Sequence, residues 1–197
     1  MKYTFTFNKI HCFDTQDWWF DDEIFAAVYP VVTRKNQAGE FESPKINPYV
    51  TEVKKDVKKN KIFQPEFGKN KNQFDVEIKD GETLSFVILL FEEDFGDTLK
   101  ALKSNSSEKD VISTTETSYT VLWDNGFGII ENITDPKKWW SYIFKSVVHT
   151  VKQLGKDDLI DRKMINCDDK YQYGFPSESD FRGSGAKYKI AYTISKS

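Results

Sequence analysis

The sequence predicts a mainly β protein, an antiparallel β-sandwich with a partly helical insertion, and three observations lead to this fold class. Aromatic residues make up 15% of the 197 residues, and aromatic side chains favour strands. The chain begins and ends in segments that alternate apolar and polar residues, as half-buried strands do. Between them, one long segment has the spacing of an amphipathic helix. We expect a single domain over residues 1–197, with the insertion at about residues 96–155.

The first third of the chain contains two predicted strands and a turn-rich stretch. Residues 2–10 alternate and place three aromatic side chains on one face. Residues 23–32 form the second predicted strand, and Pro30 indicates an edge position or an early end, because proline cannot donate to a ladder. Residues 33–48 are rich in turn-forming residues.

Residues 49–63 allow two interpretations. Their apolar positions have helical spacing, which favours a short basic helix, and a charged β ribbon is the alternative. Five lysines give the segment its charge: Lys54, Lys55, Lys58, Lys59 and Lys61.

The most apolar run of the chain, residues 83–91, predicts a central core strand. Residues 180–185 have the composition of a turn. Further strands are expected at residues 73–78, 118–123, 159–165 and 187–195.

The clearest predicted helix covers residues 136–154. Asp135 can cap it, Pro136 suits the first helical position, and Gly155 supplies a stop. A shorter helix is expected at residues 96–105. One apolar stripe follows the long helix and consists of Trp140, Ile143, Phe144, Val147, Val151 and Leu154.

Three acidic segments carry most of the information about function: residues 14–23, residues 92–97 and residues 157–169. Hard cations such as Ca²⁺ take six to eight oxygen ligands, which loops rich in Asp and Glu supply. Like charges in one loop repel unless a cation or a basic group offsets them. The alternative is that these carboxylates are solvated surface charges. The candidate metal ligands are Asp14, Asp17, Asp21, Asp22, Glu92, Asp94 and Asp97.

This layout resembles C2-type domains, the β-sandwiches that bind Ca²⁺ in Asp-rich loops at one end. The shared features are a first strand followed by the first acidic segment, and a core strand that ends in Glu92-Glu93-Asp94-Phe95-Gly96-Asp97. The aspartate spacing of the family's later loop is not found, and the helical insertion is foreign to it. The resemblance implies a binding module without catalytic machinery and leaves the ligand open.

Trp18 and Trp19 lie among the carboxylates of the first acidic segment. They are candidate contact residues for a membrane interface or a partner, because tryptophan combines an apolar body with a polar tip. The alternative is that one packs into the core and the other covers a loop. The lysines of residues 54–61 likewise suit either an anionic surface or a solvated face.

Several classes of protein are not favoured. The net charge of −3 does not favour nucleic acid, and no apolar run is long enough to predict a membrane span. No leader precedes the first strand, so we expect a cytosolic protein, one exported without a cleaved leader, or a sequence given in its mature form. No zinc-ligand pairing, nucleophile elbow, P-loop or dinucleotide fingerprint is present, so no enzyme is expected. Whether Cys12 and Cys167 pair stays open.

The sequence thus predicts a non-catalytic binding module with a Ca²⁺-dependent acidic end that contacts a membrane surface or a protein partner. The alternative is a bacterial toxin or secretion-system component that acts through protein–protein contact. A third hypothesis, a carboxylate-based hydrolase, requires two isolated carboxylates in a cleft.

Overall fold

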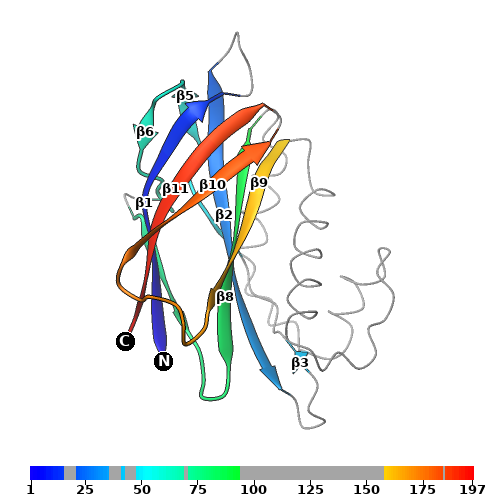
Figure 1. Cartoon of the computed structure of the whole chain (residues 1–197), viewed down its shortest axis with the longest axis vertical. Helices are drawn as coiled ribbons and strands as arrows, with labels where there is room; N and C mark the ends of the chain where they lie inside the picture. Colours follow the sequence, from blue (N-terminus) through cyan, green and yellow to red (C-terminus); the bar gives the residue numbers. More distant parts are fainter. Residues whose placement is uncertain (16–20, 36–40, 43–47, 69–70, 94–157, 184) are drawn as a thin grey trace, which may run out of the picture.

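The computed structural model describes residues 1–15, 21–35, 41–42, 48–68, 71–93, 158–183 and 185–197. All secondary structure in these residues is β (Figure 1). The strands are β1 (Lys2–Asp14), β2 (Asp22–Lys35), β3 (Phe41–Glu42), β4 (Tyr49–Val50), β5 (Lys54–Val57), β6 (Ile62–Phe63), β7 (Gln73–Glu77), β8 (Thr83–Glu92), β9 (Asp158–Cys167), β10 (Pro176–Gly183) and β11 (Ala186–Lys196).

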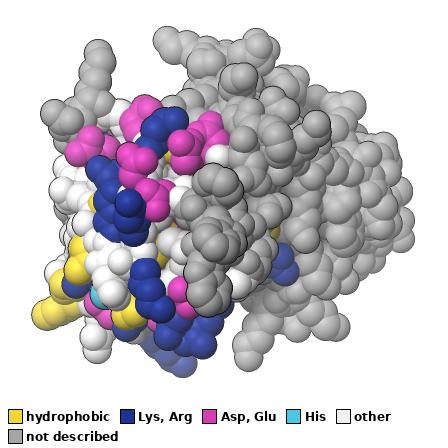
Figure 2. Space-filling model, turned by 90° about the horizontal axis from the view of Figure 1, so that it is seen from above, with side chains coloured by type: hydrophobic (Ala, Val, Ile, Leu, Met, Phe, Trp, Pro, Cys, Tyr) yellow, Lys and Arg dark blue, Asp and Glu magenta, His cyan; other side chains and the backbone are white. Residues whose placement is uncertain are grey.

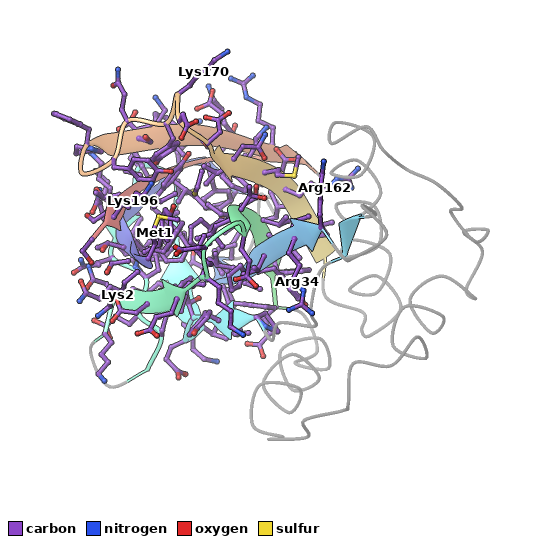
Figure 3. The ribbon with its side chains drawn as sticks, turned by 90° about the horizontal axis from the view of Figure 1, so that it is seen from below. Met1, Lys2, Arg34, Arg162, Lys170 and Lys196 are labelled. Carbon is purple, nitrogen blue, oxygen red and sulfur yellow. The ribbon has the colours of Figure 1, made fainter. Side chains whose placement is uncertain are left out.

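The first sheet has five strands in the order β10-β11-β1-β6, and β7 also pairs with β1. Every pairing in it is antiparallel, and β1 joins the two ends of the chain, with Phe5 opposite both Ile194 and Phe74. At the N-terminal end of β1, the backbone N–H groups of Lys2 and Ser197 each donate to the other's carbonyl at 2.9 Å. Both termini therefore lie at the lower end of the sandwich (Figure 1), where Figure 3 shows Met1, Lys2 and Lys196 near one another.

The second sheet has six strands, with β8 between β2 and β9. The three short strands β3, β4 and β5 pair with successive parts of the other edge of β2. The prediction of a central core strand at residues 83–91 is confirmed, because β8 is flanked on both sides and all its residues after Thr83 are buried. The predicted strand at residues 159–165 is β9.

The main core lies between the two sheets. Alternate residues of the long strands fill it, as the period of two predicts. The Phe5 ring, from the first sheet, lies 5.2 Å from the Phe86 ring of the second and stacks on Tyr192 at 5.7 Å. Aromatic side chains thus make contacts both between the two layers and within the first sheet.

The six-stranded sheet also carries a second apolar cluster, on the face that points away from the five-stranded sheet. We call it the outer face. Phe25 and Phe91 stack there with ring centroids 4.9 Å apart. The cluster consists of Phe25, Ala27, Val31, Val87, Leu89 and Phe91, all at most 6% exposed. Sheets that are buried on both faces lose the apolar–polar alternation, which explains the continuous apolar run of β8.

The structure decides between the two interpretations of residues 49–63 and corrects the expectation about Pro30. Residues 49–63 form the charged ribbon and not the basic helix, because β4, β5 and β6 all fall within this range. Pro30 neither ends β2 nor marks it as an edge strand, since it lies opposite Phe86 in the interior of the strand. It falls between the positions where β4 and β3 pair with β2, so among the described strands none pairs with this stretch from that side.

The expected turn at residues 180–185 is wrong for its first half. Residues 180–183 belong to β10, and the hairpin turn lies between Gly183 and Ala186. This strand escaped prediction because it is a polar edge strand, in which Phe181 is the one buried side chain.

The expected insertion at residues 96–155, with its helices at 96–105 and 136–154 and its strand at 118–123, lies outside the described residues. The described part of the chain contains no helix that is long and apolar enough to cross a bilayer.

Candidate functional site

Acidic residues from distant parts of the sequence meet at the upper end of the sandwich, where β1 and β8 end and β2 and β9 begin (Figure 1). Ile24 of β2 lies opposite Glu92 of β8, and Glu92 lies opposite Asp158 of β9. The backbone N–H of Glu93 donates to the carbonyl of Glu23 at 2.7 Å. We call this end the charged pole. Its described residues are Asp14, Asp21, Asp22, Glu23, Glu92, Glu93 and the lysine ribbon, residues 54–61.

The lysine ribbon supplies positive partners for the first acidic segment. Lys55 Nζ lies 3.0 Å from a carboxylate oxygen of Glu23, Lys58 Nζ lies 3.2 Å from one of Asp21, and Lys59 Nζ lies 3.6 Å from one of Asp14. Figure 2, the view from above, shows acidic and basic side chains side by side on the described surface. The repulsion between the carboxylates of this segment is therefore offset, in part, by ammonium groups.

The three ion pairs are open to solvent. The lysine side chains are 67%, 69% and 64% exposed. The hydrogen bond and the negative charge of Glu23 raise the pKa of Lys55. Exposed pairs of this kind contribute little to stability and are screened by salt. These ion pairs can consequently be exchanged for other ionic contacts with little loss of stability.

Backbone hydrogen bonds hold the ribbon beside the end of β1. The N–H of Asn60 donates to the carbonyl of Cys12 at 2.8 Å, and the N–H of Cys12 donates to the carbonyl of Lys61 at 2.9 Å. Asp56 and Asn60 have positive φ angles of 55° and 69°, a conformation that Asp and Asn tolerate better than most residues. This long-range pairing brings the lysines to the acidic segment and could not be seen in the local sequence pattern.

Two candidate ligands of the charged pole point into the protein. Asp22 is fully buried and Glu92 is 5% exposed. The Tyr188 hydroxyl donates a hydrogen bond to Asp22 Oδ2, and burial, followed by this bond to Asp22, raises the pKa of Tyr188. Asp22 thus links the beginning of β2 to β11 in the opposite sheet.

The third acidic segment divides between the two ends of the molecule. Asp158 and Asp161 lie in the first part of β9, near the charged pole, whereas Asp168 and Asp169 follow its other end. Asp161 is engaged with the neighbouring edge strand, since its Oδ2 accepts a hydrogen bond from the backbone N–H of Arg182 at 3.0 Å. Asp157 lies outside the described residues.

Of the seven predicted metal ligands, Asp14, Asp21, Asp22 and Glu92 are described and lie at the charged pole. Asp17, Asp94 and Asp97 lie outside the described residues, as do the predicted contact residues Trp18 and Trp19. Within the described ranges, no group of three or more His, Cys, Asp or Glu side chains is placed to hold a metal ion.

The cysteines are not linked to each other, because Cys12 and Cys167 are both free and buried. Burial raises the pKa of Cys12 and raises that of Cys167 to about 12. A thiol is a nucleophile only as thiolate, so both act as apolar core residues. His11 neighbours Cys12 in β1 and therefore points to the opposite face of the sheet.

Comparisons with known proteins assign no family to the chain. No protein-family model matches it, and no curated protein matches it. A search of solved structures finds human GIVD cytosolic phospholipase A2, in complex with methyl gamma-linolenyl fluorophosphonate and terbium chloride, at 8% sequence identity and a TM-score of 0.39. The match covers 100% of this chain, which spans only 17% of that protein. A likeness at this level assigns neither fold nor function. The resemblance to C2-type domains stays one of architecture, two antiparallel sheets.

Proposed function

We propose that the protein is a non-catalytic binding module that binds Ca²⁺ through the carboxylates of the charged pole and thereby contacts an anionic membrane surface or an acidic protein partner. The observation that carries this proposal is the register of β2 and β8. It brings the first and second acidic segments, separated by about seventy residues of sequence, to one end of the sandwich.

The solvent-facing carboxylates of the charged pole are the primary ligands in this proposal. Asp14 and Asp21 are both exposed, and they flank residues 16–20, which contain Asp17. Asp94 and Asp97 follow directly after the end of β8. Asp22 is left out of the proposed ligand set, because its carboxylate is buried against Tyr188.

In this proposal, the lysine ribbon couples the binding of the cation to the binding of an anionic membrane surface or an acidic partner. A divalent cation on the carboxylates of Asp14 and Asp21 competes with the ammonium groups of Lys58 and Lys59. The displaced ammonium groups, already largely exposed, then become available to phosphate or carboxylate groups of a partner. Trp18 and Trp19, which come between β1 and β2 in the sequence, are the proposed contact residues for this partner.

A calcium titration tests the metal part of this proposal. Ligand that binds only the native state raises stability by mass action, so the melting temperature should rise with millimolar Ca²⁺ and fall back on addition of a chelator. The paired variant Asp14→Asn/Asp21→Asn should lose this rise. No shift of the melting temperature at millimolar Ca²⁺ contradicts the proposal.

Cosedimentation with vesicles tests the coupling. Lys58→Gln/Lys59→Gln removes the competing ammonium groups, so it should strengthen the response to Ca²⁺ while weakening binding to phosphatidylserine vesicles. Lys79→Gln/Lys170→Gln, at exposed lysines outside the charged pole, is the matched control. Binding to a protein partner that a chelator leaves unchanged would favour the calcium-independent alternative instead.

A further inference from the structure

Aromatic and basic side chains gather on the solvent side of the five-stranded sheet, the face that points away from the main core. The strands β6, β1, β11 and β10 lie side by side there (Figure 1). Residues opposite each other in register share one face of a sheet, and one such row across the four strands consists of Ile62, His11, Lys189 and Asp180. We call this group of side chains the β1 patch. It consists of Lys9, His11, Phe13, Ile62, Lys187 and Lys189.

Phe13 lies at the centre of the β1 patch. The centroid of its ring lies 4.0 Å from that of the His11 ring. Lys187 Nζ and Lys189 Nζ lie 5.3 Å and 5.9 Å from the Phe13 centroid, which is within the range of a cation–π contact. On the other side of His11, the Ile62 side chain is 56% exposed. The patch therefore offers apolar area and positive charge next to each other.

Two lysines of the patch can accept a new anion. Within the described ranges, no carboxylate forms an ion pair with Lys9 or Lys187. Asp14 lies opposite Lys187 in register, but its carboxylate lies 3.6 Å from Lys59 Nζ. The contact with the Phe13 ring also restricts the Lys187 side chain. Less conformational freedom is therefore lost when its ammonium group binds an anion.

The neighbouring charges favour a protein segment over a uniformly anionic surface. Glu178 and Asp180 on β10 share the face of the patch, where they pair with Lys189 at 3.4 Å and with Arg182 at 3.3 Å. A bilayer with anionic groups over its whole surface would bring negative charge against these two carboxylates as well as against the lysines. A peptide can place its carboxylates over the lysines alone, and such complementarity selects the partner.

We propose that the β1 patch binds an acidic segment of a protein partner, in which an aromatic or aliphatic side chain lies next to the carboxylates. The carboxylates pair with the ammonium groups of Lys9 and Lys187, and the apolar side chain packs on Phe13 and Ile62. The inference goes beyond the proposed cation site, because it uses none of the proposed ligands and needs no Ca²⁺. Either proposal can fail without the other.

Fluorescence anisotropy in the presence of a chelator tests this inference, because the chelator removes any contribution of Ca²⁺. The probe is a labelled copolymer of Glu and Tyr, which should bind more tightly than poly-Glu. Lys9→Gln/Lys187→Gln should raise the Kd of the Glu–Tyr copolymer about ten-fold. Phe13→Ser should weaken its binding to the level of poly-Glu. Lys79→Gln/Lys170→Gln makes the same change of charge at exposed lysines outside the patch. It is the matched control and should leave the Kd unchanged.

Four results would overturn the inference. The first is that the Glu–Tyr copolymer does not bind, and the second is that Lys9→Gln/Lys187→Gln leaves its Kd unchanged. The third is an equal loss in the control variant or in Lys58→Gln/Lys59→Gln, which would place the binding outside the patch. The fourth is binding to phosphatidylserine vesicles, in the same chelator, that Lys9→Gln/Lys187→Gln abolishes, which would identify a membrane as the occupant. Circular dichroism establishes that each variant keeps its β structure, and the lysine variants serve as the test if Phe13→Ser does not fold.

Discussion

Asp22 shows how a single residue in an acidic run can have a role different from its neighbours. Asp21 lies exposed beside Lys58, whereas Asp22 is fully buried and accepts a hydrogen bond from Tyr188. Composition places both residues in one cluster of candidate ligands. The signal that separates them is the period of two, which sets Asp22 on the same face of β2 as Ile24 and Val28. The identity of its partner, Tyr188, is not in the local sequence.

The hydrogen bond to Asp22 gives a prediction at the residue scale. Tyr188→Phe removes the donor and leaves a buried carboxylate oxygen without it, so the free energy of unfolding should fall by about 1–3 kcal/mol. Tyr192→Phe is the control, because its hydroxyl lies 3.4 Å from Ser179 Oγ in a part-buried contact, and its loss should be clearly smaller. Urea unfolding of both variants measures the difference. Equal losses would mean that Asp22 does not depend on Tyr188.

The strands of this protein were predictable to the degree that their residues alternate or are uniformly apolar. The segments at both ends of the chain, and the apolar run of β8, were found from the sequence because burial on one or both faces imposes those patterns. β10 was missed because it lies at a sheet edge and buries only Phe181. Pro30 misled the prediction because it lies in a stretch of β2 with which none of the described short strands pairs, whereas β8 pairs with this stretch from the other side.

The close approach of β9 and β10 gives a prediction at the element scale. These strands are edges of different sheets, and they meet where a Cβ on Gly183 would lie 1.9 Å from the carbonyl oxygen of Ile160. Gly183→Ala must push the two sheets apart, and should lower the free energy of unfolding by about 1–3 kcal/mol, or more if the backbone cannot shift.

A second glycine serves as the control for Gly183→Ala. Gly174 has a φ of 80°, and no atom lies within 4 Å of the place that an alanine methyl group would occupy there. Gly174→Ala therefore tests conformational strain without a clash, at a cost of about 1 kcal/mol. Thermal unfolding of the two variants compares them. If Gly183→Ala costs no more than Gly174→Ala, the contact between β9 and β10 does not constrain the packing of the sheets.

Alkaline pH gives a prediction for the whole molecule. Burial raises the pKa of Cys167 from 9.0 to about 12, and it also raises the pKa of Cys12, Tyr29 and Tyr188. Below pH 9 these groups are protonated in both the folded and the unfolded state. The unfolded chain loses thiol protons above pH 9 and phenol protons above pH 10, whereas the folded chain keeps them, so stability falls as pH rises. For a group between its unfolded and its folded pKa, the fall is at most about 1.4 kcal/mol per pH unit.

The contribution of one thiol to this fall can be isolated. Cys167→Ala removes a group that titrates near pH 9 in the unfolded chain and near pH 12 in the folded one. The variant should therefore lose less stability than the parent protein between pH 9 and pH 10.5, whatever the effect of the substitution at neutral pH. Urea midpoints at several pH values measure the two slopes. Parallel slopes would show that Cys167 is not protected from ionisation by folding.

The sequence by itself determined the mainly β class, the faces of the long strands and the presence of concentrated acidic charge, because these follow from local periodicity and composition. Only the tertiary structure decided which charges meet. Strand pairing brought the lysine ribbon beside Asp14, Asp21 and Glu23 and turned Asp22 toward Tyr188. Both outcomes depend on contacts between residues far apart in the chain, which no local pattern encodes.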